Sequence, residues 1–177
     1  GFHRHDGLFL RLSVGSGYAM TSVSSAGNDV AIKGIAGVGD FAIGYSLIDN
    51  LSLSFDIFGP VLTNPTLELN GQSGRAGENV SVSWMGFGAG INYYLMPANI
   101  YFALNAGAST MSLKVNDQDK YETGTGFMMQ VMLGKEWWVS ENWGIGMAAN
   151  LIYSSIPESS GSAVWTGYAF GLLFSST

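Results

Sequence analysis

The chain has 177 residues, of which 11% are charged, 13% are aromatic and 25 are glycine, and its formal charge at pH 7 is −6. Soluble domains carry roughly a quarter charged residues, so this composition argues against an ordinary water-exposed surface, and the negative charge argues against nucleic acid as a partner. The lack of cysteine excludes disulfides and thiolate metal sites. No stretch approaches the roughly 18 consecutive apolar residues of a membrane helix, so an apolar chain of this kind favours a closed β-barrel.

Apolar residues alternate with small or polar residues through eight stretches, which predicts eight β-strands, each with two chemically different faces. We expect an all-β fold, an eight-stranded antiparallel up-and-down transmembrane β-barrel. In the second strand, Val30 and Ile32 have the opposite parity to the apolar residues that follow, and a β-bulge would explain this. The predicted strands lie near residues 8–21, 30–47, 51–61, 84–95, 100–109, 127–138, 143–153 and 164–174.

The connections between these strands alternate in character. Three are short turns around Asn50, Asn99 and Asn142, whereas the other four, near 22–29, 63–79, 116–120 and 157–161, are longer or more polar. Short turns at one end and longer loops at the other are typical of periplasmic turns and extracellular loops in outer-membrane barrels. We therefore expect one domain over 1–177, with a periplasmic lead-in at 1–6, the barrel at 7–174 and a tail at 175–177. Both termini would then be periplasmic.

One face of each predicted strand is almost continuously apolar, while the other collects Gly, Ala, Ser, Asn and the few charges. A soluble barrel that encloses a ligand also alternates, but its exterior would need Lys and Glu at every second position, and the chain lacks them. Lys135 has outward parity, which snorkelling to the headgroups or a bulge would accommodate. Aromatic residues near the short turns predict a girdle at the membrane interface. Its members are Trp137, Trp138, Trp143, Tyr45, Tyr93 and Tyr94.

Four ionisable residues inside strands have inward parity and fall toward the short turns: Arg11, Asp40, Asp56 and Glu136. With Asn92 and Asn105 they predict one hydrogen-bonded cluster in which Arg11 is the hub and the carboxylates share it. Such side chains commonly fill the lumen of an eight-stranded barrel. The alternative is a path for protons or ions through the lumen. We expect no metal or cofactor.

The last strand carries the most specific motif. Tyr168, Phe170, Leu172 and Phe174 alternate along it and end in an aromatic residue, and the segment resembles the C-terminal assembly signal of bacterial outer-membrane β-barrels. The whole pattern resembles the small eight-stranded barrels of that class, such as OmpX, OmpW, PagP and the membrane domain of OmpA. This resemblance implies the barrel-assembly machinery and outer-membrane lipids (or detergent in solution) as partners, and we expect a monomer.

The same resemblance implies a structural role or interactions through surface loops. The alternative is a narrow channel or conduit for ions or small hydrophobic molecules, as the likeness to OmpW implies. We expect no enzymatic activity and no catalytic residues. Both histidines lie before Gly7, at the end opposite the loops, so a Ser-His-Asp arrangement cannot form there.

Overall fold

The computed structural model describes residues 5, 7–25, 27–116 and 118–177. The described residues fold into β-strands joined by turns, and none of them forms a helix long and apolar enough to cross a membrane. The strands are β1 (Leu8–Ser25), β2 (Asn28–Ile48), β3 (Leu51–Thr63), β4 (Thr66–Leu69), β5 (Gln72–Arg75), β6 (Val80–Leu95), β7 (Ile100–Val115), β8 (Gln118–Glu122), β9 (Gly126–Trp138), β10 (Gly144–Pro157) and β11 (Val164–Ser176).

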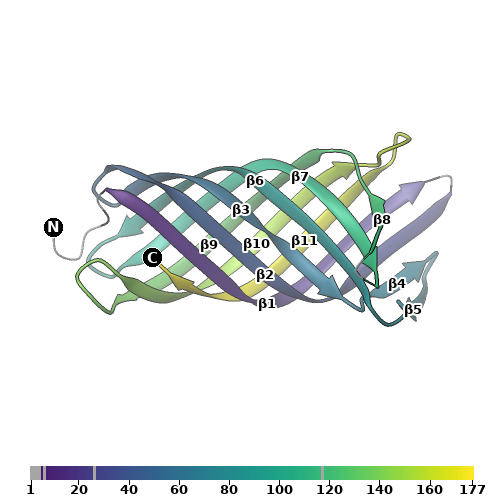
Figure 1. Cartoon of the computed structure of the whole chain (residues 1–177), viewed down its shortest axis with the longest axis horizontal. Helices are drawn as coiled ribbons and strands as arrows, with labels where there is room; N and C mark the ends of the chain where they lie inside the picture. The colour runs from purple at the N-terminus through teal and green to yellow at the C-terminus, as the bar shows by residue number, and fades with distance from the viewer. Residues whose placement is uncertain (1–4, 6, 26, 117) are drawn as a thin grey trace.

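Eight strands form a closed antiparallel ring, in the order β1, β2, β3, β6, β7, β9, β10 and β11 (Figure 1). β1 closes the ring because it pairs with β2 on one side, from Leu8 opposite Tyr45 to Ser25 opposite Asn28, and with β11 on the other. Every long strand therefore has two hydrogen-bonded neighbours, which removes the exposed edges of an open sheet. The predicted eight-stranded barrel is confirmed.

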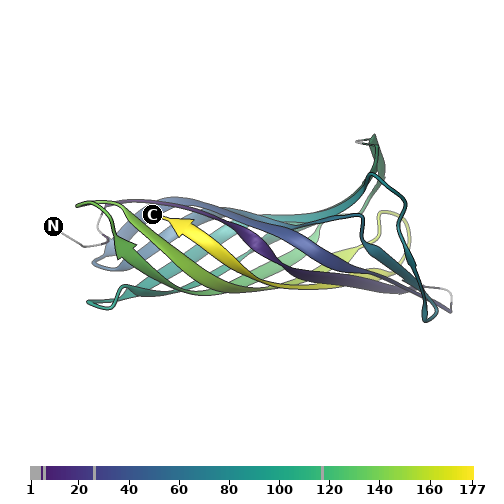
Figure 2. The same ribbon diagram turned by 90° about the horizontal axis from the view of Figure 1, so that it is seen from below.

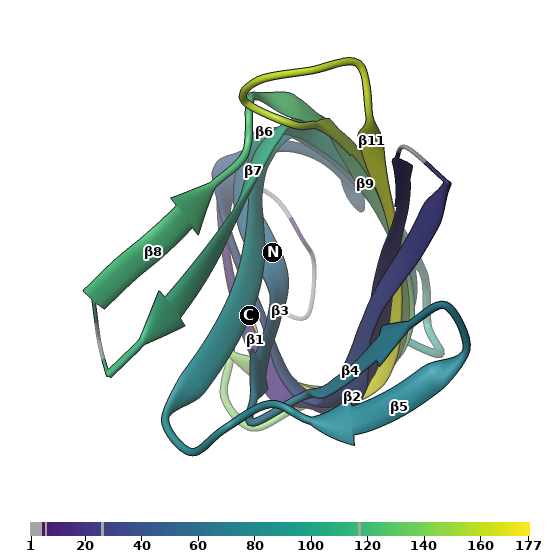
Figure 3. The same ribbon diagram turned by 90° about the vertical axis from the view of Figure 1, so that its right-hand side faces the viewer.

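The two ends of the barrel differ. The C-terminus and the start of β1 lie at one end, which we call the termini end, and β4, β5 and β8 lie at the other, the hairpin end (Figures 1 and 2). β4 pairs with the hairpin-end part of β2 and with β5. β8 pairs with the hairpin-end part of β7. Viewed from the hairpin end, both extensions lean away from the ring (Figure 3).

Strand extents correct three details of the sequence analysis. Most of the expected loop near 22–29 is strand, because the ladder between β1 and β2 continues to Ser25 and Asn28. No bulge interrupts this ladder, so Ile32 points inward, where it is 4% exposed. Ser175 and Ser176 belong to β11 rather than to a tail, because Gly146 and Ile145 of β10 extend the ladder to them.

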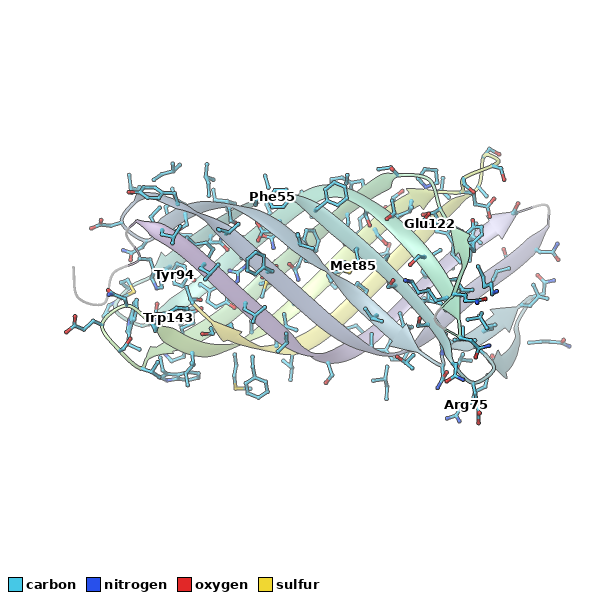
Figure 4. All side chains as sticks on the ribbon, in the orientation of Figure 1. Phe55, Arg75, Met85, Tyr94, Glu122 and Trp143 are labelled. Atoms are coloured by element: carbon cyan, nitrogen blue, oxygen red, sulfur yellow. The ribbon has the colours of Figure 1, made fainter. Side chains whose placement is uncertain are left out.

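The barrel wall exposes large apolar side chains on all eight ring strands. Phe55 is 50% and Met85 is 40% exposed, and both project from the wall (Figure 4). Soluble monomers rarely expose apolar patches larger than a few hundred Å², so a continuous belt of this kind indicates contact with lipid. β1, β2, β6 and β7 have 16 to 21 residues, more than the roughly 9–11 that cross a bilayer, so they extend beyond the belt.

The inward-facing residues divide into two parts along the axis. Toward the termini end they are largely polar, and toward the hairpin end they are apolar. The change is visible within β3, where Asp56 is followed on the inward face by Phe58 and then Leu62, all three 0% exposed. The interior is therefore a polar layer capped by an apolar layer.

Candidate functional site

Arg11 is the centre of the polar layer. Its side chain is 0% exposed, and its Nε and Nη2 donate to Asp40 Oδ1 at 3.2 and 3.1 Å. Nη1 donates to Asn92 Oδ1 at 2.6 Å, and Nη2 lies 3.7 Å from Met132 Sδ. β1 is separated from β6 and β9 by intervening ring strands, so these contacts cross the lumen.

A second set of hydrogen bonds extends the network from Arg11. Asn105 Nδ2 donates to Asp40 Oδ2 at 3.1 Å and to Gln130 Oε1 at 2.8 Å. Asn92 Nδ2 donates to Ser54 Oγ at 3.0 Å, and Ser54 Oγ donates to Asp56 Oδ2 at 2.6 Å. The network therefore joins side chains from β1, β2, β3, β6, β7 and β9.

The Arg11 guanidinium lies close to two carboxylates in this network. Arg11 Nη2 is 3.1 Å from Asp40 Oδ1 and 3.9 Å from Asp56 Oδ1. The Arg11 guanidinium carbon also lies 5.2 Å from the centre of the Tyr101 ring and 5.7 Å from that of Phe9, within the range of a cation–π contact. Buried ions need such partners, because removal from water is otherwise very unfavourable.

Glu136 differs from the prediction of one shared cluster. Its Oε1 accepts a hydrogen bond from Thr177 Oγ1 at 2.6 Å, so it is bonded at the termini end rather than to Arg11. The reason is its position on β9, where Gln130 and Met132, not Glu136, are level with the Arg11 network. The structure thus brings together five of the six predicted cluster residues: Arg11, Asp40, Asp56, Asn92 and Asn105.

Four residues of the predicted aromatic girdle lie on the outer wall, and the prediction is wrong for the other two. Trp137, Trp143, Tyr45 and Tyr93 are 48 to 63% exposed on the outer wall. Tyr94 is 1% exposed and points into the lumen, and Trp138 packs near the His5 ring, with ring centres 4.9 Å apart. Adjacent residues of a strand face opposite sides, so only one member of the Tyr93–Tyr94 pair and one of the Trp137–Trp138 pair can face lipid.

His5 closes part of the lumen at the termini end. Its ring stacks on Tyr94, with centres 3.5 Å apart, and its Nε2 lies 2.9 Å from Asn99 Oδ1. His5 is 7% exposed, so this part of the expected lead-in is packed against the barrel. The other lead-in residues, at 1–4 and 6, lie outside the described residues.

Lys135 keeps its outward parity without a bulge. Its Nζ donates to the backbone oxygen of Ala98 at 2.5 Å and lies 5.6 Å from the Trp137 ring centre. The ammonium therefore reaches the short turn at the termini end of the barrel, as snorkelling predicts.

A cavity of about 280 Å³ opens at the hairpin end of the lumen, and we call it the mouth cavity. Almost all of its lining is apolar, and it comes from β2, β4, β7, β8, β11 and the turn after β10. The lining residues are Val30, Ile32, Leu67, Met111, Leu113, Tyr121, Glu158 and Trp165. Strand alternation alone did not predict this cavity, although the reversed parity of Val30 and Ile32 was its signal.

Sequence reasoning also missed Gln130, Ser54 and Tyr101 as members of the polar layer. Their inward parity would have placed them there, because each is separated from an assigned inward residue of its strand by an even number of positions. Among the described residues, no three His, Asp or Glu side chains are grouped so that they could hold a metal ion.

The predicted assembly signal lies on the outer wall. Tyr168, Phe170, Leu172 and Phe174 are 48, 58, 64 and 66% exposed along β11. β11 is the strand that pairs with β1 to close the ring. The geometry places the motif on the closing strand, and its use as a signal stays a prediction.

Comparison with known proteins bears on the fold. No family model and no curated protein sequence matches the chain. Among solved structures, Neisserial surface protein A is 14% identical, with a TM-score of 0.50, and the match covers 92% of this chain and 95% of that one. The chain has the fold of the small outer-membrane β-barrel proteins.

Other outer-membrane barrels are also similar. The outer-membrane protease OmpT of Escherichia coli is 10% identical, with a TM-score of 0.51, over 99% of this chain and 97% of that one. OprG of Pseudomonas aeruginosa is 11% identical, with a TM-score of 0.49, over 97% and 98%. At these identities the likeness concerns the fold of the outer-membrane barrel and does not transfer an activity.

Proposed function

We propose that this chain is an integral, non-enzymatic outer-membrane barrel whose lumen is closed to ions and hydrophilic solutes, and that it acts through the surfaces at its hairpin end. The observation that carries the proposal is the network around Arg11, which joins six of the eight ring strands across the lumen. A polar network of fully buried side chains favours a fixed plug over a hydrated pore.

The apolar layer above this network supports the same proposal. Phe58 and Met128 are the inward-facing neighbours of Asp56 and Gln130 toward the hairpin end, on β3 and β9, and both are 0% exposed. They meet at Gly86, where an added Cβ would lie 3.2 Å from Phe58 Cζ and 2.9 Å from Met128 Sδ. An ion that crossed the barrel would have to leave the polar layer and pass this apolar one, which is unfavourable.

The lengths of the connections support the proposed orientation. Short turns at the termini end are typical of the periplasmic side, so the hairpin end, with β4, β5 and β8, would face outward. β5 has only exposed residues, and it forms the outer edge of the extension from β2. Such projections present backbone and side chains to partners beyond the membrane, and β11 would present its outward row to the assembly machinery.

Single-channel recording in planar bilayers tests the closed lumen. We expect no discrete openings from the wild type, and small openings or leakage from Arg11→Ala, because the side chain that crosses the lumen is removed. Lys135→Ala, outside the lumen, serves as the matched control and should stay silent. Discrete openings of the wild type would contradict the plug and make the polar network a filter.

The mouth cavity supports a second candidate function, the binding of small hydrophobic molecules. Its lining is apolar, and Trp165 contributes an indole ring that is 8% exposed. Ligand sites typically combine such an apolar lining with few polar groups, and a cavity of about 280 Å³ is near the lower end of their usual size. Because the polar layer lies beneath it, the cavity favours binding at the mouth over passage through the barrel.

Binding of the fluorescent probe N-phenyl-1-naphthylamine to the protein in a nonionic detergent tests this candidate. We expect saturable binding by the wild type and at least a tenfold loss in Leu67→Glu, since a carboxylate in an apolar pocket is strongly disfavoured. Leu69→Glu is the matched control, because Leu69 is on the same strand and does not line the cavity. Equal losses in both variants would argue against a site at the mouth.

A further inference from the structure

Three hydrogen-bond donors lie in one row on the outer wall at the hairpin end. In the ladders, Lys33 of β2 is opposite Thr66 of β4, and Thr66 is opposite Arg75 of β5. Residues directly opposite one another in an antiparallel sheet share a face and lie about 4.5–5.5 Å apart. We call Lys33, Thr66 and Arg75 the outer row. It faces away from the lumen, because its neighbours Ile32 and Leu67 line the mouth cavity on the other face.

The outer row borders a surface cavity of about 440 Å³. Its lining combines the three donors with the outward side chains below them. The lining residues are Tyr18, Lys33, Gly34, Ile35, Thr63, Asn64, Thr66 and Arg75. Toward the membrane belt, Ile35 is 79% exposed and Tyr18 stacks on Phe170, with ring centres 6.0 Å apart. The cavity is therefore cationic on the side of the hairpin end and apolar on the side of the membrane belt.

Of the two cations in the outer row, Arg75 is available to bind an anion. Lys33 pairs with Glu68, two residues along β4 from Thr66 on the same face. Arg75 is exposed, projects from the hairpin end (Figure 4), and forms no ion pair within the part of the chain that the structure describes. One carboxylate against two cations gives the site a net positive charge in a chain whose formal charge is −6.

We propose that the outer row binds the phosphate group of an acylated, phosphorylated lipid whose chains lie along Ile35 and Tyr18. The ammonium, hydroxyl and guanidinium match the oxygens of a phosphate, and hydrogen bonds from charged donors are the stronger kind. The apolar wall between the outer row and the membrane belt favours a lipid over free phosphate. The phosphate of one lipid can bind the outer row while its acyl chains contact the apolar wall. The assignment rests on the membrane location given under the proposed function.

The probe is diphosphoryl lipid A, added to the purified full chain in a nonionic detergent and measured by native mass spectrometry. We expect Arg75→Gln and Thr66→Val each to weaken binding, Arg75→Gln by about tenfold or more, the usual effect of losing a hydrogen bond to a charged group. Glu68→Gln should tighten binding, because Lys33 is then released from its carboxylate. Lys120→Gln, a basic residue of β8 outside the row, is the control and should bind as the wild type does.

One further measurement distinguishes a lipid ligand from free phosphate. Inorganic phosphate at the same concentrations should bind at least tenfold more weakly, and equal binding would overturn the lipid assignment. Unchanged lipid A binding in Arg75→Gln, or no gain in Glu68→Gln, would overturn the site. Binding in micelles does not depend on conductance, so channel openings would contradict the closed lumen and leave this site standing.

Discussion

Replacement of Arg11 by methionine should lower the free energy of unfolding by about 3–5 kcal/mol, the usual effect of removing one partner from a buried ion pair. Methionine keeps much of the side-chain volume, so the effect reports the charge more than a cavity. Asp40 and Asp56, at 2% and 0% exposure, would then lie in the lumen without the guanidinium that is 3.1 and 3.9 Å from their carboxylate oxygens. Urea unfolding in detergent micelles, followed by tryptophan fluorescence, measures this change.

A second substitution separates charge from packing in this prediction. Adding Asp40→Asn to Arg11→Met should recover part of the lost stability, because one uncompensated carboxylate is removed while its shape is kept. Lys135→Met is the control on the outer wall, and an exposed charge of this kind contributes roughly 0–1 kcal/mol. If Arg11→Met were as stable as the wild type, the network would not hold the barrel together.

Replacement of Gly134 by alanine should lower the free energy of unfolding by about 1–3 kcal/mol, the usual range for overpacking a core. A Cβ built on Gly134 would overlap the ring of Tyr101, which lies across from it in the ladder between β7 and β9. The ring has little room to move, because its other contacts are the Arg11 guanidinium at 5.2 Å and Tyr94 at 5.4 Å. The same urea titration measures the effect.

A double-mutant cycle with Tyr101→Leu tests the stated cause. Without the ring, Gly134→Ala should have little effect, so the two substitutions should be strongly non-additive. Gly37→Ala is the matched control, because a Cβ at Gly37 in β2 would meet nothing within 4 Å. A loss of stability that is the same in the presence and absence of the ring would assign the effect to the backbone of β9.

The sequence contained enough information for the barrel and for most of the polar layer. Period-two alternation decides which residues share a face, so Arg11, Asp40 and Asp56 could be assigned to one interior without coordinates. Inward parity alone does not give the height of a residue along the barrel axis. Parity therefore groups Glu136 with Arg11, although Glu136 lies at the termini end and bonds to Thr177.

The sequence by itself determined the class of fold, because a charge-poor chain with alternating faces and no long apolar run has one common way to satisfy its backbone in a membrane. Only the tertiary structure decided how residues distant in sequence meet. Register across several strands places Lys33 beside Thr66 and Arg75, and it brings Ile32 and Trp165 to one cavity. Pairing register is a property of neighbouring strands together, so local alternation predicts the face of each residue but not its partners.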